Sequence, residues 1–182
     1  MHEQGRWRSR LNDGSQRISP YAEANVVFRA MRRMAGWRPV SWLYARILSP
    51  IDRAVSRISG RRMTFVRLVS GLPVLLLTTT GARTGAKRTQ PLLYLRERDD
   101  LVVIGSNWGQ AHNPAWCYNL RANPYAEVTL SGSTYEVIAR EVTQPQRDLY
   151  WQQGCRMYPA WNLYKIRSPH RQFPIMILSK AP

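Results

Sequence analysis

The stretch from Thr78 to Arg88 carries the residues best suited to chemistry. It reads TTTGARTGAKR and combines four threonines, two glycines and three cations. Glycines let a backbone turn sharply and bring its N–H groups to an anion, and arginine and threonine side chains complete such a cradle. The spacing is that of neither a P-loop nor a dinucleotide-binding fingerprint. We therefore predict a site for phosphate or carboxylate, with a solvated basic hairpin turn as the alternative.

A second polar stretch, GSNWG at 105–109, follows a predicted strand. Asn113 and Pro114 are typical of the N-cap and the first position of a helix, which we expect to run to about residue 122. The N-terminus of that helix could face an anion. Trp116 and Asn119 are three residues apart and share one helical face, where they could offer a wall and an amide to a flat heteroaromatic ring. The alternative is a core tryptophan behind a capped helix.

Three aromatic residues recur at helical spacing further on, namely Tyr158, Trp161 and Tyr164. Such a stripe is more often part of a core than of a cofactor site. No serine–histidine–aspartate triad, carboxylate pair or cysteine–histidine pair suggests itself, and the histidines and two cysteines lack metal-ligand spacing. The sequence therefore favours chemistry carried by a bound cofactor over hydrolysis by side chains, and it predicts no metal site.

The elements that must position these residues are short. Apolar and β-branched runs predict strands over 74–79, 91–95, 101–106, 126–130, 134–140 and 173–178. Besides the helix that starts at Asn113, a second is predicted from about Pro145 to Met157, with Thr143 as its cap. Turn signals lie at 98–100 and 131–133. Six short strands at this spacing favour a small antiparallel barrel over a doubly wound sheet, in a mainly β fold with flanking helices.

The charge of the chain is strongly positive and unevenly distributed. There are 27 Lys+Arg against 11 Asp+Glu, a net charge of +16, and fourteen of the arginines but only four acidic residues lie in 1–71. Such an excess predicts attraction to nucleic acid, to anionic lipid, or to a phosphorylated or carboxylated ligand. No nucleic-acid-recognition pattern accompanies it, so we do not expect a nucleic-acid partner.

The chain divides into three predicted parts. Residues 1–19 are polar, rich in arginine and without periodicity, which predicts a disordered basic tail. Residues 20–62 place apolar side chains at helical spacing with arginines between them, which predicts a basic amphipathic extension suited to an anionic membrane surface. Helices packed on the barrel with solvated arginines are the alternative. The barrel would occupy 63–182. Because no run reaches the ~18 apolar residues of a spanning helix, we expect peripheral attachment to the cytoplasmic side of the plasma membrane.

Three segments together resemble the deazaflavin-dependent nitroreductases, also called the deazaflavin quinone reductases of actinobacteria. They are LLTTTGARTGAKRTQPLLYL (76–95), IGSNWGQAHNPAWCYNLRANP (104–124) and YWQQGCRMYPAWNLY (150–164). The similarity covers roughly 50–180, and it is specific because the TTTGxRTG and NPxWxxNLxANP motifs lie at the family's mutual distance. It implies a split β-barrel of the FMN-binding type, here with an N-terminal helical extension, and the deazaflavin coenzyme F420 as cofactor.

The resemblance also assigns roles at matching positions. The phosphate and acidic tail of the cofactor would be held by Gly81, Arg83, Thr84, Gly85 and Arg88. The deazaflavin ring would lie beside Ser106 and Asn107 and near Trp116 and Asn119. A movable wall over the acceptor would be formed by Tyr158, Trp161 and Tyr164. The hydroxyl of Ser106 or Tyr158 would act in catalysis by polarising an oxygen of the acceptor.

The implied reaction is hydride transfer from the reduced deazaflavin to a menaquinone-like quinone or a nitroaromatic acceptor. Three positions depart from the family pattern: Ala82 replaces a cation, Asn107 replaces a lysine, and Trp161 replaces a tyrosine of the nitroimidazole-reducing members. The last change removes a phenol that could donate a hydrogen bond to a nitro group. Two alternatives stay open, a split-barrel oxidoreductase that binds FMN and a non-catalytic basic module that binds membrane or nucleic acid. The oligomeric state is left open as well.

Overall fold

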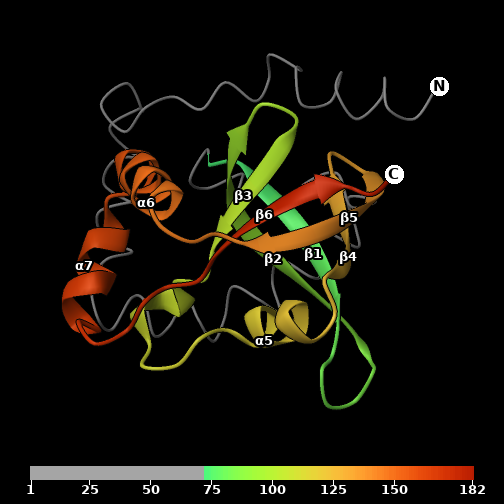
Figure 1. Cartoon of the computed structure of the whole chain (residues 1–182), viewed down its shortest axis with the longest axis horizontal. Helices are drawn as coiled ribbons and strands as arrows, with labels where there is room; N and C mark the ends of the chain where they lie inside the picture. The colour runs from blue at the N-terminus through green and yellow to red at the C-terminus, as the bar shows by residue number, and fades with distance from the viewer. Residues whose placement is uncertain (1–71) are drawn as a thin grey trace.

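The computed structural model describes residues 72–182, which form a β-barrel flanked by helices (Figure 1). Its strands are β1 Val74–Thr80, β2 Lys87–Glu97, β3 Asp100–Ile104, β4 Tyr125–Leu130, β5 Ser133–Glu141 and β6 Ile175–Lys180. Its helices are the 3₁₀ turn η3 Asn107–Gly109 and the α-helices α5 Ala115–Ala122, α6 Gln146–Met157 and α7 Ala160–Arg167. The predicted tail at 1–19 and the predicted extension at 20–62 lie outside the described residues.

The six strands close into one barrel in the order β1-β2-β3-β6-β5-β4, and every neighbouring pair is antiparallel. Closure satisfies the backbone hydrogen bonds along both edges of each strand. This confirms the predicted small antiparallel barrel. No described helix is long and apolar enough to cross a membrane.

The strand directions give the barrel two unlike ends. β1 runs toward the loop at 81–86, and β3 runs toward the segment that contains η3 and α5. β4 starts beside the end of β1, because Ala126 pairs with Thr79, so both loops lie at one end, here called the loop end. The two-residue turns at 98–99 and 131–132 lie at the opposite end, here called the turn end. The candidate site residues of both loops therefore gather at the loop end (Figure 1).

Two apolar clusters cover the two faces of the sheet. Alternation along β3 sends Leu101 and Val103 into the cluster inside the barrel, and Val102 and Ile104 into the outer cluster. The outer cluster is completed by side chains of α6 and α7, which cover this part of the barrel. A strand buried on both faces reads as a continuous apolar run, which is why the hydrophobicity of β3 shows no alternation in sequence.

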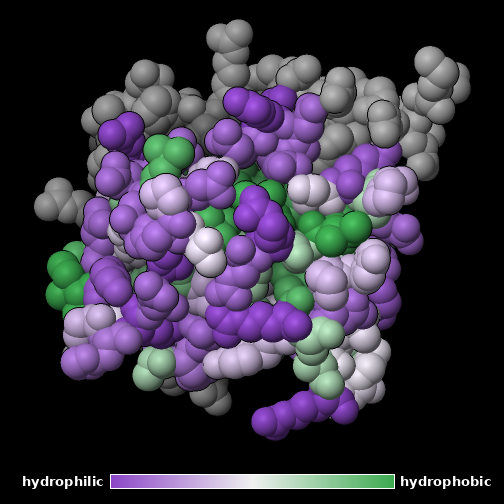
Figure 2. Space-filling view, in the orientation of Figure 1, coloured by the Kyte–Doolittle hydropathy of each residue, from purple (hydrophilic) through white to green (hydrophobic). Residues whose placement is uncertain are grey.

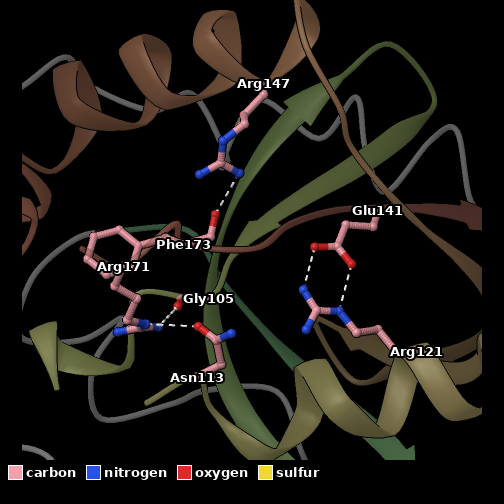
Figure 3. A network of polar contacts seen from close by, with 7 residues as sticks. All are labelled: Gly105, Asn113, Arg121, Glu141, Arg147, Arg171 and Phe173. Atoms are coloured by element: carbon pink, nitrogen blue, oxygen red, sulfur yellow. Dashed lines mark hydrogen bonds and ion pairs between the residues drawn. The ribbon is translucent and has the colours of Figure 1, made fainter. Parts of the chain in front are cut away.

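Helix α5 closes the loop end of the barrel. Its Trp116, Cys117 and Leu120 are buried in the inner cluster with side chains from all six strands. On its outer side, Arg121 makes a two-bond ion pair with Glu141 of β5, with nitrogen–oxygen distances of 2.7 and 2.6 Å (Figure 3). Arg121 lowers the pKa of the Glu141 carboxyl, but both side chains are more than a third exposed and the pair adds little stability.

Several predicted boundaries and caps need correction. β2 begins at Lys87 instead of 91, because Pro91 occupies a place within the strand opposite Leu76. β6 spans 175–180, two residues later than predicted. Neither Asn113 nor Thr143 caps a helix: the caps are Pro114 and Pro145, without side-chain hydrogen bonds. The side chain of Asn113 is instead a tertiary hydrogen-bond acceptor.

Candidate functional site: two loops joined by helix α5

The loop between β1 and β2 folds into a single tight turn. The N–H of Gly85 donates to the carbonyl of Gly81 at 2.8 Å, and the N–H of Gly81 donates to the carbonyl of Ala86 at 2.9 Å. Gly85 has a φ of +66°, a conformation that favours glycine, and a Cβ on Gly81 would lie 2.9 Å from the Thr84 hydroxyl. The turn thus favours glycine at position 85 for its backbone angle and at position 81 for the close approach of Thr84.

The turn offers hydrogen-bond donors that the described part of the chain does not use. The N–H groups of Arg83 and Thr84 form no hydrogen bond with a described residue, and the exposed guanidinium groups of Arg83 and Arg88 form no ion pair with one. Lys87 differs, because its Nζ lies 3.0 Å from Oε1 of Glu127. Adjacent free N–H groups in a turn, flanked by two unpaired cations, are suited to an anion.

Asn119 of α5 fastens this turn to the barrel. Its Oδ1 accepts from the N–H of Ala82 at 3.0 Å, and its Nδ2 donates to Oγ1 of Thr79 at 2.9 Å. Asn119 is 7% exposed and Thr79 is 1% exposed, so the bond between them is buried, while the bond to the exposed Ala82 is partly buried. The sequence predicted that this amide contacts a ring, but both its Oδ1 and its Nδ2 are hydrogen-bonded to protein groups. Its contact with a ligand stays a prediction.

Replacing Asn119 by Ala is expected to release the turn at 81–86 from the barrel. The variant leaves the buried hydroxyl of Thr79 and the N–H of Ala82 without their partner. We expect a loss of about 1–3 kcal/mol of unfolding free energy, measured in urea. Amide exchange at Ala82 should also become faster. Asn162→Ala, at an exposed position of α7, is the matched control. Slow exchange at Ala82 in Asn119→Ala would contradict this anchoring role.

The second loop, which follows β3, contains an unusual run of left-handed residues. Asn107, Trp108 and Gly109 have φ values of 47°, 56° and 75°. Asn107 bonds within the loop, since its Nδ2 donates to the carbonyl of His112 at 3.0 Å. The hydroxyl of the half-buried Ser106 has no hydrogen-bond partner among residues 72–182. The structure therefore leaves the predicted catalytic hydroxyl available, while the amide of Asn107 shapes its own loop.

Arg171, in the segment between α7 and β6, binds this loop through four hydrogen bonds, a role that sequence reasoning missed. Its guanidinium donates to the carbonyls of Ser106 and Gln110 at 2.9 and 2.7 Å. It also donates to the carbonyl of Gly105 and, at 2.8 Å, to Oδ1 of Asn113 (Figure 3). The Cζ atom of Arg171 lies 4.4 Å from the centre of the Phe173 ring. Burial lowers the pKa of this guanidinium, and the partners that offset its desolvation are neutral oxygens.

The predicted aromatic wall is packed inside the outer cluster. Tyr158, Trp161 and Tyr164 are 5%, 3% and 1% exposed, and the phenol oxygens of the two tyrosines are 3.3 Å apart. Tyr158 lies between α6 and α7, so the three residues do not form one helical stripe. Tyr164 also packs against Gly109, where an added Cβ would lie 3.1 Å from it. The wall therefore adjoins the second loop, while its contact with an acceptor stays a prediction.

Trp116 is 2% exposed in the inner cluster, as expected for a core tryptophan behind the loops. Its contact with a ring stays a prediction. Beside it, burial raises the pKa of the Cys117 thiol to about 12, and burial raises that of Cys155 to about 11. Neither thiol is a thiolate near neutral pH, which argues against a cysteine nucleophile. Residues 72–182 contain no group of three or more His, Cys, Asp or Glu able to hold a metal ion.

Comparison with known proteins decides the family. The model of the F420H(2)-dependent quinone reductases matches residues 51–180. The chain belongs to this family. An F420H(2)-dependent quinone reductase of Mycobacterium tuberculosis is 38% identical over 121 residues, which cover 63% of this chain and 78% of that protein. A putative member from the same organism is 29% identical over 107 residues, covering 59% and 89%.

Solved structures agree with this assignment. An F420-H2-dependent reductase, FDR-A, is 30% identical to the chain and superposes with a TM-score of 0.54, over 59% of this chain and 94% of that one. A structure described as a domain-swapped dimer is 27% identical, with a TM-score of 0.56 and coverages of 78% and 100%. The predicted split-barrel fold and the predicted family are confirmed, and with them the class of F420-dependent oxidoreductases.

The residues at the loop end fit the cofactor that the family name implies. Coenzyme F420 carries a phosphate and an acidic tail, which need donors and positive charge. The free N–H groups of Arg83 and Thr84 are suited to serve as the donors, and the guanidinium groups of Arg83 and Arg88 are suited to supply the charge. The Ala82 side chain carries no charge and its N–H is already bound by Asn119, so the charges suited to the acidic tail are those of the two arginines.

Proposed function

We propose that this chain reduces a quinone with the reduced form of coenzyme F420. The observation that carries the proposal is the turn at 81–86, in a chain that belongs to the F420H(2)-dependent quinone reductase family. There the N–H groups of Arg83 and Thr84, and the guanidinium groups of Arg83 and the nearby Arg88, have no partner among residues 72–182. The bound cofactor supplies a hydride. The protein binds the anionic end in this turn, and the β3–α5 loop borders the place where the ring is expected.

Ser106 is the better placed of the two predicted catalytic hydroxyls. Ser106 is half-buried and its hydroxyl has no partner among the described residues, whereas the Tyr158 hydroxyl is buried and lies beside that of Tyr164. We propose that Ser106 donates a hydrogen bond to the acceptor oxygen where negative charge develops, a geometry that stabilises the transition state. A menaquinone-like acceptor is favoured over nitroimidazoles, because Trp161 lacks a phenol.

A test of this function compares cofactors first and acceptors second. Purified protein is titrated with F420 and separately with FMN, and quenching of ligand fluorescence gives the two affinities. We expect binding of F420 and, with its reduced form, oxidation by a menaquinone analogue at a higher rate than by a nitroimidazole. Tight binding of FMN without binding of F420 would assign the chain to the flavin alternative. Salt-sensitive binding to nucleic acid without any turnover would assign it to the non-catalytic alternative.

We also propose that the chain attaches peripherally to an anionic membrane on its cytoplasmic side, where a lipid-dissolved quinone is accessible. The excess of arginine over acidic residues in 1–71 supports this. In the described part, α7 exposes Leu163 and Ile166, 42% and 74% accessible, and hydrophobic residues surface at that edge in Figure 2. Co-sedimentation with anionic but not zwitterionic vesicles is the expected result, and equal recovery with both would reject the electrostatic part of the proposal.

A further inference from the structure

The loop after β3 holds a conformation that needs outside support. Asn107 and Trp108 are non-glycine residues with φ values of 47° and 56°, and Gly109 continues the run at 75°. Left-handed backbone of this kind costs free energy in a residue with a side chain, and it persists only where neighbouring groups fix it. Within the loop, the N–H of Gly109 donates to the carbonyl of Ser106, and the N–H of Gln110 donates to the carbonyl of Asn107. These two backbone bonds are few for three consecutive left-handed residues.

The support comes from the segment between α7 and β6. Arg171 binds the loop on both sides of the left-handed run, at Gly105 and Ser106 before it and at Gln110 and Asn113 after it. The same segment adds the Ser168 hydroxyl, which donates to the carbonyl of Gly109 at 2.9 Å. A planar guanidinium with donors pointing in several fixed directions suits this task, which an ammonium group cannot fully reproduce.

The acceptors of Arg171 indicate that it positions the loop and does not form an ordinary ion pair. All four acceptors are neutral oxygens, and none of the bonds that Arg171 makes with residues 72–182 goes to a carboxylate. Arg171 itself is 9% exposed. A buried cation of this kind is costly unless its hydrogen bonds are complete. Through these bonds Arg171 fixes the position of Ser106, at the start of the loop, and that of Asn113, just before α5.

We propose that Arg171 is a positioning residue for the reaction: it holds the Ser106–Gly109 loop in the shape that receives the cofactor ring and the acceptor, without touching either. This rests on the proposed function, which places the ring beside that loop. Because α5 also carries Asn119, the contact with Asn113 links the second loop to the anion-binding turn through one helix. Loss of Arg171 should therefore weaken binding of the whole cofactor.

The first test measures the loop without any cofactor. Amide hydrogen exchange at Gly109 and Gln110 is compared in the wild type, Arg171→Gln, Arg171→Lys and Arg147→Gln. Arg147 is the matched control, because it is also partly buried and donates to a backbone carbonyl, that of Phe173, at 2.7 Å, but does not touch the loop (Figure 3). We expect at least about tenfold faster exchange in Arg171→Gln, a smaller increase in Arg171→Lys and none in Arg147→Gln.

The second test measures the affinity for oxidised F420 by fluorescence quenching, with a urea unfolding curve for every variant. We expect Kd to rise about tenfold or more in Arg171→Gln and by less in Arg171→Lys, while Arg147→Gln loses stability but keeps its Kd. If Arg171→Gln does not fold, the comparison of Arg171→Lys with Arg147→Gln decides. Unchanged exchange and Kd in a folded Arg171 variant would overturn the inference. Absence of F420 binding by the wild type would instead overturn the proposed function, while the exchange result would still test the loop.

Discussion

Replacing Arg83 by Ala is expected to lower the affinity for F420 by about 10- to 100-fold with the fold intact. A charge-assisted hydrogen bond contributes about 1.5–3 kcal/mol, and each 1.4 kcal/mol corresponds to a factor of ten in Kd. Arg83 is exposed and has no ion-pair partner among residues 72–182, so its removal costs the folded protein little. The measurement is fluorescence quenching of the oxidised cofactor at low and high salt.

The matched control for this prediction is Arg156→Ala, which removes an equally exposed arginine from α6. It changes the net charge of the chain by the same amount, so a general electrostatic effect would appear in both variants. We expect the wild-type Kd for Arg156→Ala at every salt concentration. The double variant Arg83→Ala, Arg88→Ala should lose most of the salt dependence of binding, because screening acts on the charges that meet the anion. Equal losses in Arg83→Ala and Arg156→Ala would place the anionic end elsewhere.

Replacing Trp116 by Ala should produce the largest loss of stability among the variants considered. The ring is 2% exposed and fills the inner cluster at the loop end. Truncation of a buried tryptophan typically costs about 3–5 kcal/mol, since both the transferred area and the remaining cavity contribute. Urea unfolding should show this loss, and the same helix provides a control. Tyr118 is 49% exposed, so Tyr118→Ala should change the unfolding free energy by no more than about 0.5 kcal/mol.

Trp116→Phe separates the two roles that the sequence left open for this residue. A core role predicts a moderate loss of stability with an unchanged Kd for F420, because the phenylalanine ring fills part of the same space. A ring-contacting role predicts a weaker Kd at nearly unchanged stability. The position of Trp116 among side chains from all six strands favours the first result.

The barrel was predictable because its signals are local. Burial alternates over the first four residues of β4 and the first five of β5. Between the two strands, Ser131 and Gly132 have positive φ values and form the turn of the hairpin that the sequence indicated at 131–133. The turn between β1 and β2 was predictable for the same reason, since its glycines, threonine and arginine lie within eight residues of one another. Its binding of an anion stays a prediction. The predicted cap at Asn113 was wrong, because a residue 58 positions away uses its side chain.

The positioning contacts of the site could not be predicted in this way. Arg171 acts on oxygens 58 to 66 residues away, and three of these belong to the backbone, which leaves no mark in the identity of the residues contacted. Asn119 was placed on the correct helix, but its partners lie 37 and 40 residues away. A spacing rule shows which side chains share a helical face and says nothing about what lies opposite that face.

The separation of the barrel into unlike ends has a practical consequence. Ser131 and Gly132 form the whole connection between β4 and β5, and register places them at the opposite end of the barrel from the β1–β2 turn. A fluorophore, an affinity tag or a surface-coupling peptide inserted there would be remote from the loops expected to handle ligand. The turn end is therefore a suitable attachment point for immobilised assays in which the cofactor reaches the loop end from solution.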